Sequence, residues 1–387
     1  MNNDTSIQER GPVAAGETQG WTVGLRARAA KARIPLSAVL ELTSRCNLRC
    51  RHCYLGDQEH QQANRERECD TASVMRSLDE WASAGCLYLL ITGGDPMMRA
   101  DFADVYRHAC ELGMVVTVFG DGILVTDRIL ALFRELPPRM VEISIYGATA
   151  ATYENVTRVP GSHARAWEGI RRLQASGIRI GLKTMLMTLN QHELEAMALQ
   201  ASGLGCPFRF DAAVFPCIAG GPQPSPTSSL PGGEGEAPES PVDLRVPPEE
   251  AVRLDMAVPE QREKWVRSVR SGRGSPDTDR LYPCGAGTTS FYADPYGFLS
   301  PCLMTRLYRY PGQGRAFQDV WRDDLGRIRD RKRTRCDTSF SGAMRGACTH
   351  CPAFNEVETG DEETESGYMR MTTRLRYEAV VAIEERE

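Results

Sequence analysis

Residues 36–54 read LSAVLELTSRCNLRCRHCY, and this stretch decides how the rest of the chain is interpreted. Its first part is an apolar run that predicts a buried strand over Ala38–Leu42. Its second part places Cys46, Cys50 and Cys53 on one tight loop. Three thiolates at this spacing can hold three corners of a cubane iron–sulfur cluster and leave the fourth iron open, whereas ferredoxin-type clusters use four cysteines. A loop directly after a strand is also where α/β folds place their active sites.

Outward from this loop, the chain alternates short apolar runs with amphipathic windows as far as about Pro216. The runs predict six strands, over Ala38–Leu42, Leu87–Ile91, Val115–Phe119, Val141–Ile145, Ile180–Met187 and Phe208–Ala212. Helical windows cover Thr71–Ala84, Ala103–Leu112 and Ala164–Ser176, and each is followed by a glycine that can close the last turn in the left-handed conformation. Six strand–helix units in series imply a parallel sheet with right-handed crossovers, and they are too few for a closed eight-stranded barrel.

The cysteine loop and this strand pattern resemble the radical SAM superfamily. The resemblance implies an α/β fold, a partial (β/α)6 TIM-like barrel. It also implies that S-adenosylmethionine chelates the open iron of a [4Fe–4S] cluster, and that one electron cleaves it to a 5′-deoxyadenosyl radical that abstracts hydrogen. Carried onto this chain, Cys46, Cys50 and Cys53 are the cluster ligands. His52 takes the place where the family usually has an aromatic residue beside the adenine.

A second motif, Thr92-Gly93-Gly94-Asp95-Pro96, follows the second predicted strand. It resembles the family's Gly-Gly-Glu-Pro run, whose backbone binds the methionine amino group. Asp95 is one methylene shorter than the usual Glu, and the two glycines allow the backbone to approach a ligand closely. The remaining candidates for the cofactor pocket are Ser144, Lys183 and Asn190, and for Lys183 a solvated strand position is the alternative.

Two residues are candidates for catalysis. Asp121 lies in Phe119-Gly120-Asp121-Gly122, which replaces the family's usual Thr-Asn-Gly turn. It either faces the substrate or shapes the turn, since Asp before Gly is a common turn pair. Cys336 is a candidate for replacing a metal ligand or acting as a free thiol, with a small buried hydrophobic residue as the alternative, because thiol reactivity depends on exposure and pKa.

A second set of cysteines comprises Cys284, Cys302, Cys348 and Cys351, with Gly297 placed to form a hairpin before Cys302. The pattern resembles the auxiliary-cluster domains called SPASM and twitch, and with no cysteine after Cys351 it resembles the shorter twitch form. That resemblance implies a small C-terminal α+β domain with one auxiliary [4Fe–4S] cluster. For both cysteine sets a zinc site is the alternative, because zinc also takes four thiolate ligands.

The predicted organisation has six segments. Residues 219–248 are rich in Pro, Gly, Ser and Glu and predict a mobile loop, with a plain linker and a functional lid as the two readings. The segments are an N-terminal extension (1–35), the partial barrel (36–218), this loop (219–248), bridging helices broken at Pro259 (249–281), the twitch domain (282–360) and a C-terminal helix or tail (361–387).

The formal charge of −5 and the absence of a long apolar run argue against nucleic acid and membrane as partners. Thirteen cysteines without an export signal indicate a reducing, cytoplasmic location. Residues 142–149 and 159–162 are similar to radical SAM enzymes that mature ribosomally made peptides. The predicted substrate is therefore a peptide, modified by a thioether or carbon–carbon crosslink or a related change, with a flavodoxin or ferredoxin as reductant.

Recognition of a peptide leader would need a separate protein or direct binding to the barrel, and the basic run Arg26–Arg33 is either a contact for an acidic leader or a solvated helix face. The Cys-x17-Cys…Cys-x2-Cys layout also resembles a twitch-type dehydrogenase of an aminoglycoside alcohol, which is the alternative function. An iron–sulfur redox sensor is the non-enzyme alternative, but it would leave Gly93-Gly94-Asp95-Pro96 without a role.

Overall fold

The computed structural model describes residues 15–56, 58–217, 240–272, 280–305, 307–335, 342–347 and 351–386. Its centre is a nine-stranded sheet with the strand order β6-β5-β4-β3-β2-β1-β7-β8-β9. The strands are β1 Ser37–Glu41, β2 Tyr88–Thr92, β3 Val115–Gly120, β4 Met140–Ser144, β5 Ile180–Met185, β6 Phe208–Asp211, β7 Ser290–Ala293, β8 Phe298–Ser300 and β9 Tyr310–Pro311. The first six strands are parallel and lie within two residues of the predicted bounds, so the predicted partial barrel is confirmed.

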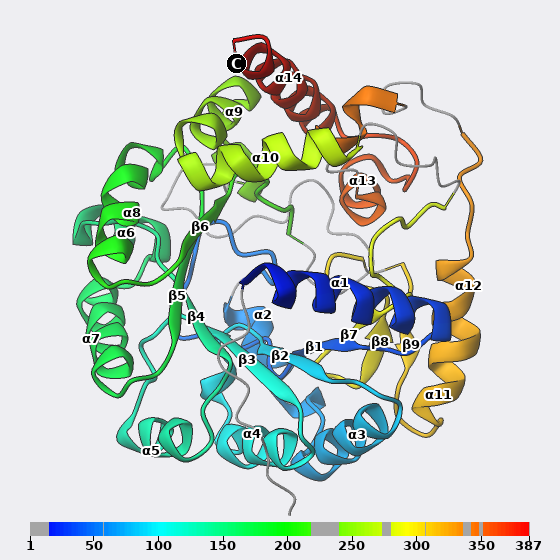
Figure 1. Cartoon of the computed structure of the whole chain (residues 1–387). Coiled ribbons are helices and arrows are strands. Elements are labelled where there is room, and N and C mark those ends of the chain that lie inside the picture. Colours follow the sequence, from blue (N-terminus) through cyan, green and yellow to red (C-terminus); the bar gives the residue numbers. More distant parts are fainter. Residues whose placement is uncertain are drawn as a thin grey trace, which may run out of the picture.

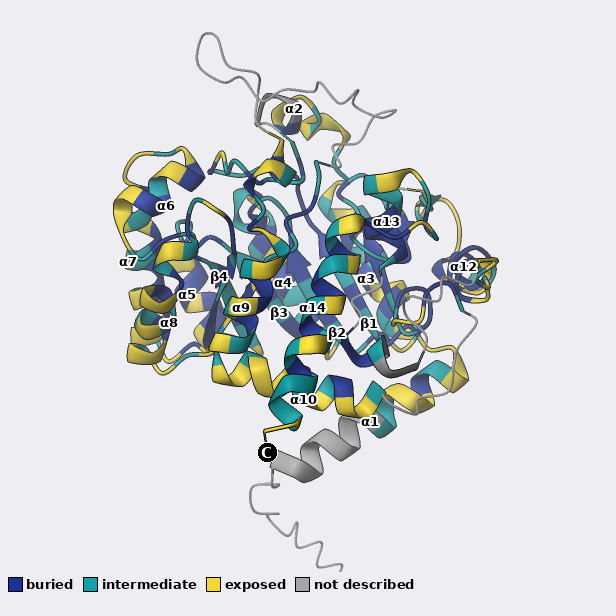
Figure 2. Cartoon of the chain, turned by 90° about the horizontal axis from the view of Figure 1, so that it is seen from above, coloured by how far each residue is buried: buried dark blue, intermediate teal, exposed yellow. Residues whose placement is uncertain are grey.

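The helices lie outside the curved sheet and at its two ends (Figure 1). They are α1 Ala15–Ala32, α2 Gln58–Ala63, α3 Thr71–Ser83, α4 Phe102–Glu111, α5 Asp127–Glu135, α6 Ala150–Thr157, α7 Ser162–Ala175, α8 Leu194–Gly203, α9 Pro248–Ala257, α10 Pro259–Gly272, α11 Phe317–Asp319, α12 Leu325–Arg329, α13 Pro352–Thr359 and α14 Gly367–Glu384. Figure 2 shows α2, which follows the cysteine loop, and α1 at opposite ends of the molecule. None of the helices in the described part of the chain has the length and apolar character needed to cross a membrane.

Local signals account for the helix ends. Asp70 caps α3 by accepting a hydrogen bond from the Ser73 backbone at 2.8 Å, which satisfies one of the free N–H groups of the first turn. Gly85, Gly113 and Gly177 have φ of 96°, 78° and 71°, as the predicted left-handed ends require. The predicted helical break is present, because α9 ends at Ala257 and α10 begins at Pro259.

The C-terminal strands extend the barrel sheet itself. β7 pairs in parallel with β1, with Ser37 opposite Ser290 and Ala38 opposite Phe291. The ring of Phe291 then packs between Trp81 of α3 and Phe317 of α11, with centroid distances of 5.1 and 4.8 Å. Each fully buried aromatic side chain contributes about 1.5–3 kcal/mol, so this cluster joins the two halves of the chain into one core.

The structure describes only the last part of the predicted mobile loop, 219–248. Residues 218–239 lie outside the described residues. The last part of the predicted loop is ordered and buried, because Pro241–Leu244 form a 3-10 turn and Leu244 and Val246 have 1% and 0% exposed surface. These two side chains join apolar clusters with residues of β5 and β6 and the segments after them, so the mobile-loop prediction is wrong for 240–248.

Candidate functional site

The loop that carries Cys46, Cys50 and Cys53 follows the end of β1 and is held first by the end of β2. The Gly94 and Asp95 N–H groups donate to the carbonyl oxygens of Thr43 and Arg45, both at 2.9 Å. A Cβ added to Gly93 would lie 2.3 Å from the Thr43 oxygen, and one added to Gly94 would lie 2.3 Å from the Arg45 oxygen. The close approach that these glycines permit is therefore to the cysteine loop itself.

The far end of the cysteine loop is held by α6. The N–H groups of Arg49 and Arg51 donate to the carbonyl oxygens of Thr157 and Val156, both at 3.0 Å. These oxygens lie in the last turn of α6, where helical carbonyls have no partner within the helix. The carbonyl groups at the helix end thus gain donor partners, and the loop is fixed on both sides of its second cysteine.

Three contacts that sequence reasoning missed complete the support. The Glu68 carboxylate accepts from the Thr43 hydroxyl and forms an ion pair with Arg45 at 3.0 Å. The Ser44 and Tyr296 hydroxyls are 3.0 Å apart, and Tyr296 lies on the β7–β8 hairpin. These groups are far apart in the sequence and meet only in the folded chain, so no local sequence pattern predicts the contacts. The loop is therefore held from four directions by the protein's own residues.

The three motif thiols lie close enough to affect one another. Burial raises the pKa of all three, and that of Cys53 reaches about 11. After burial, the charge of Asp121 raises the pKa of Cys46, and the charge of Cys53 raises that of Cys50. Within the described residues, no three His, Cys, Asp or Glu side chains stand in metal-ligand positions. A bound cation would favour the thiolates by offsetting this repulsion, so the donor set fits an iron–sulfur cluster.

Four buried polar atoms around the loop find no hydrogen-bond partner in the described structure. They are Asn47 Nδ2, His52 Nδ1, Asp121 Oδ2 and the Tyr153 hydroxyl. Burial lowers the pKa of His52 to about 4, so its imidazole is neutral, and its ring packs edge-on against Tyr146 at 4.7 Å. Unsatisfied buried polar atoms are rare in native proteins and often mark a missing water or ligand. Their grouping beside three thiols fits a polar cofactor such as S-adenosylmethionine.

Asp95 and Asp121 form a buried carboxyl pair beside the loop. Asp95 accepts from the backbone N–H groups of Met97 at 2.9 Å and Asp121 at 3.0 Å. Burial raises the pKa of both, and the charge of Asp95 raises that of Asp121 further. Asp121 shapes its turn by accepting from the Ile123 N–H at 2.8 Å, while its second oxygen is the unpartnered atom. One oxygen of Asp121 therefore shapes the turn, and the other is left for the second predicted role, which is to face the substrate.

Residues 40–201 match the family model described as the Radical SAM superfamily. The chain contains a radical SAM domain. In sequence, it is 30% identical over 165 residues to the AdoMet-dependent heme synthase of Methanosarcina barkeri, covering 43% of this chain and 46% of that protein. It is also 30% identical over 171 residues to the PqqA peptide cyclase of Ruegeria pomeroyi, covering 44% and 45%. The chain thus spans less than half the length of these two curated relatives.

Solved structures resemble the chain well beyond the radical SAM domain. Streptococcus suis SuiB bound to precursor peptide SuiA superposes with a TM-score of 0.65 at 16% identity, covering 95% of this chain and 84% of that one. Native anSMEcpe with bound AdoMet and Kp18Cys peptide superposes with a TM-score of 0.63 at 11% identity, covering 91% and 100%. At these identities the likeness shows the fold.

The other predicted cofactor residues differ in their surroundings. Ser144 ends β4 and pairs in register with Lys183 of β5. The Lys183 ammonium lies 3.0 Å from the centre of the Phe119 ring, and burial lowers its pKa well below the usual value. The residue as a whole is half-buried, and its place in a cofactor pocket stays a prediction. Asn190 is fully buried, and its amide is used within its own turn, accepting from Met187 N–H at 2.8 Å and donating to the Met185 oxygen at 3.0 Å. That amide fixes the turn after β5.

The structure describes three of the four cysteines of the second set, namely Cys284, Cys302 and Cys351. Cys284 is exposed, whereas Cys302 and Cys351 are partly buried. Burial first, and then the charges of Cys351 and Cys284, raise the pKa of Cys302 to about 12, so the three thiols share one region. Gly297 has a φ of 82° in the predicted hairpin. Cys348 and Cys336 lie outside the described residues.

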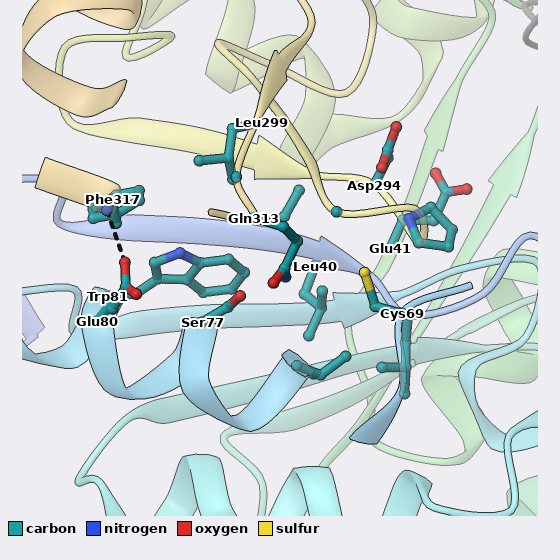
Figure 3. Close-up of a pocket in the computed structure, with 16 residues that line it drawn as sticks. Leu40, Glu41, Cys69, Ser77, Glu80, Trp81, Asp294, Leu299, Gln313 and Phe317 are labelled. Atoms are coloured by element: carbon teal, nitrogen blue, oxygen red, sulfur yellow. Dashed lines mark hydrogen bonds between the residues drawn. The ribbon is translucent and has the colours of Figure 1, made fainter. Parts of the chain in front are cut away.

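A pocket lies between α3, β1 and the β7–β9 strands, with a volume of about 480 Å³ that includes space open to solvent. Figure 3 shows the Cys69 thiol and the Trp81 ring among its lining residues. Burial raises the pKa of Cys69, and its backbone N–H donates to the Pro295 oxygen at 2.8 Å. The motif cysteines do not line this pocket, which is a packing seam between the barrel and the C-terminal strands.

Proposed function

We propose that the protein is a radical SAM oxidoreductase that modifies a ribosomally made peptide. The observation that carries this proposal is the cysteine loop clamped at the strand ends, with four unpartnered buried polar atoms around it. When bound, the cluster and S-adenosylmethionine supply a radical that removes hydrogen from the substrate. The proposed product is an oxidative crosslink, a thioether or carbon–carbon bond, or a related peptide change.

The roles proposed for the chain's own residues follow from their positions. Cys46, Cys50 and Cys53 hold the cluster, while the Gly93–Pro96 run fixes the loop and lines the cofactor. The His52 ring is neutral and packed on Tyr146, so it offers the adenine a flat apolar face with one free nitrogen. Ser144 is proposed to meet the ribose or carboxylate, and Asp121 to face the reacting substrate.

The second cysteine set is proposed to hold an auxiliary [4Fe–4S] cluster on Cys284, Cys302, Cys348 and Cys351. Mutual effects of three of these thiols on their pKa values support this ligand set. Four thiolates leave no open iron, so the proposed role is electron transfer. A cytoplasmic flavodoxin or ferredoxin is the proposed reductant, and the leader of the peptide is bound by this chain or by a separate protein.

The peptide substrate is supported by one relative and two fold neighbours. The relative is named a peptide cyclase, and the neighbours were solved with the precursor peptide SuiA and with the Kp18Cys peptide. A second candidate is oxidation of a small molecule such as an aminoglycoside alcohol. It is favoured by the equal identity to a heme synthase and by the cysteine spacing at 284, 302, 348 and 351.

The test is anaerobic reconstitution with iron and sulfide, followed by reduction and mass spectrometry. Release of 5′-deoxyadenosine is expected, and its absence in a fully reconstituted protein would overturn the radical SAM assignment. Addition of a peptide encoded beside the gene should give a product lighter by two hydrogen atoms. An unchanged mass with an inverted residue would indicate epimerisation, and release of deoxyadenosine without any peptide change would favour the small molecule.

A further inference from the structure

The C-terminal half of α1 carries cations that the proposed chemistry does not use. Arg26, Arg28, Lys31 and Arg33 are all exposed, and Ile34, which follows them, keeps 36% of its surface exposed. We call these five residues the α1 basic surface. Figure 2 shows α1 along the edge of the molecule, with exposed residues on its outer side.

The end of α1 is fixed rather than frayed. The Trp321 indole N–H donates to the Arg33 carbonyl oxygen at 2.6 Å, and the Ile34 N–H donates to the Ala29 oxygen at 2.9 Å. Arg33 has a φ of 58°, the left-handed conformation that closes a helix but is costly for a residue with a side chain. The cations are therefore presented from a rigid position.

The cations of the α1 basic surface differ from other exposed cations of the chain in their partners. Within the described residues, none of its four cations forms an ion pair, although other exposed arginines do, such as Arg107 with Glu135. The nearby Asp330 is held by Arg329 at 3.0 Å, and its lowered pKa reflects Arg329 first and then Arg33 and Arg280 among the smaller effects. Asp330, at the end of α12, therefore lies near Arg33 but is paired with Arg329.

The concentration of positive charge on the α1 basic surface is unusual because the chain as a whole is acidic, with 51 Asp and Glu against 46 Lys and Arg. Like charges three or four residues apart on a helix destabilise it, and Arg28 and Lys31 have that spacing. The helix dipole favours Lys31 in the last turn but does not reach Arg26. An uncompensated basic surface with an exposed apolar side chain is suited to a ligand that carries acidic and apolar groups.

We propose that the α1 basic surface binds an acidic peptide segment with apolar residues, which for the proposed function is the leader of the substrate. This inference rests on the peptide substrate proposed above. The surface lies at the opposite end of the molecule from α2 and the cysteine loop (Figure 2). An extended chain covers about 3.3 Å per residue, so a linker of roughly ten residues reaches about 30 Å around a barrel of this kind. The segment can be held here while the reacting residues enter the cysteine end.

The test measures binding, not turnover. The probe is a fluorescein-labelled 16-residue peptide with six Glu and three Leu, titrated by anisotropy with the reconstituted protein. We expect saturable binding that weakens at least about tenfold between 50 and 300 mM salt, as contacts between exposed charges do. The variant R26E/R28E/K31E should weaken it at least about tenfold, and Ile34→Ser about threefold. A control, R128E/R134E/R179E, makes the same charge change on α5 and before β5 and should alter binding less than about twofold.

Four outcomes overturn the proposal: no saturable binding, equal loss in the control variant, equal binding of the peptide with Gln in place of Glu, or tighter binding of a single-stranded DNA of equal charge. The last would assign the surface to nucleic acid. Thermal unfolding of each variant shows that lost binding is not lost folding. Because deoxyadenosine release is measured separately, failure of this surface and failure of the radical SAM assignment are distinguishable.

Discussion

Replacing Gly94 by Ala tests whether the end of β2 positions the cysteine loop. The added methyl would lie 2.3 Å from the Arg45 oxygen, 2.5 Å from the Arg45 carbonyl carbon and 2.6 Å from the Ser44 oxygen. All three are backbone atoms, so no side chain can swing away to make room. The loop must move by about 1 Å, and Cys46 follows Arg45 directly, so the movement reaches the first motif thiol.

The expected cost can be worked from these contacts. Separation of the two segments weakens the hydrogen bonds from Gly94 to Thr43 and from Asp95 to Arg45, each contributing about 1 kcal/mol. Overpacking of a rigid site adds about 1–3 kcal/mol. The lower entropy of the unfolded alanine chain returns about 0.4–1 kcal/mol. The net loss in the free energy of unfolding is therefore about 3 kcal/mol.

Urea unfolding of the anaerobic, metal-free protein measures this loss, and iron and sulfide analysis after reconstitution measures the site. Gly203→Ala is the matched control, because nothing lies within 4 Å of its added methyl and its φ is not positive. The control should be neutral or slightly stabilising. If Gly94→Ala kept its full cluster and unfolded within about 0.5 kcal/mol of the parent, the steric reasoning would be refuted.

Three further predictions concern the thiols and their support. Cys46→Ala should lose about four irons per chain, whereas Cys110→Ala on α4 should lose none, as measured by iron analysis; equal iron in both would contradict the ligand assignment. Glu68→Gln removes the charge facing Arg45 and should cost about 1–3 kcal/mol in urea unfolding, while Glu135→Gln, in an exposed pair, should give no measurable change. The pKa of Cys86 is raised by burial to about 12, so about one molecule in 10⁴ is thiolate at pH 8; native protein should not be alkylated there, and rapid labelling seen by mass spectrometry would disprove its burial.

The elements that local chemistry determines were predictable. Each barrel strand is a short apolar run because helices cover the outer face of the sheet, and the run Val115–Phe119 lies within β3 for that reason. The cysteine loop was equally accessible, since ligand spacing within one loop is a local property. Gly85 ends its helix through its own backbone freedom, which needs no knowledge of the remaining fold.

What could not be predicted depends on contacts between distant segments. Gly94 was expected to approach a ligand, but the atoms nearest to it belong to Ser44 and Arg45. Glu68 lies in a charged stretch that is typical of a solvated turn, and only the folded chain brings it to Arg45. Leu244 and Val246 follow a Pro- and Gly-rich run whose composition hides them, yet they are buried against the segments that end the barrel.

The parallel pairing of β7 with β1 has a consequence for biosynthesis. Ser44 and its hairpin partner Tyr296 are 252 residues apart in the chain. At about 5–20 residues per second, a ribosome needs on the order of ten to fifty seconds to make the polypeptide between them. During that interval the nascent loop lacks the contact between Ser44 and Tyr296. The loop therefore reaches its full set of protein contacts only after the C-terminal strands have been made.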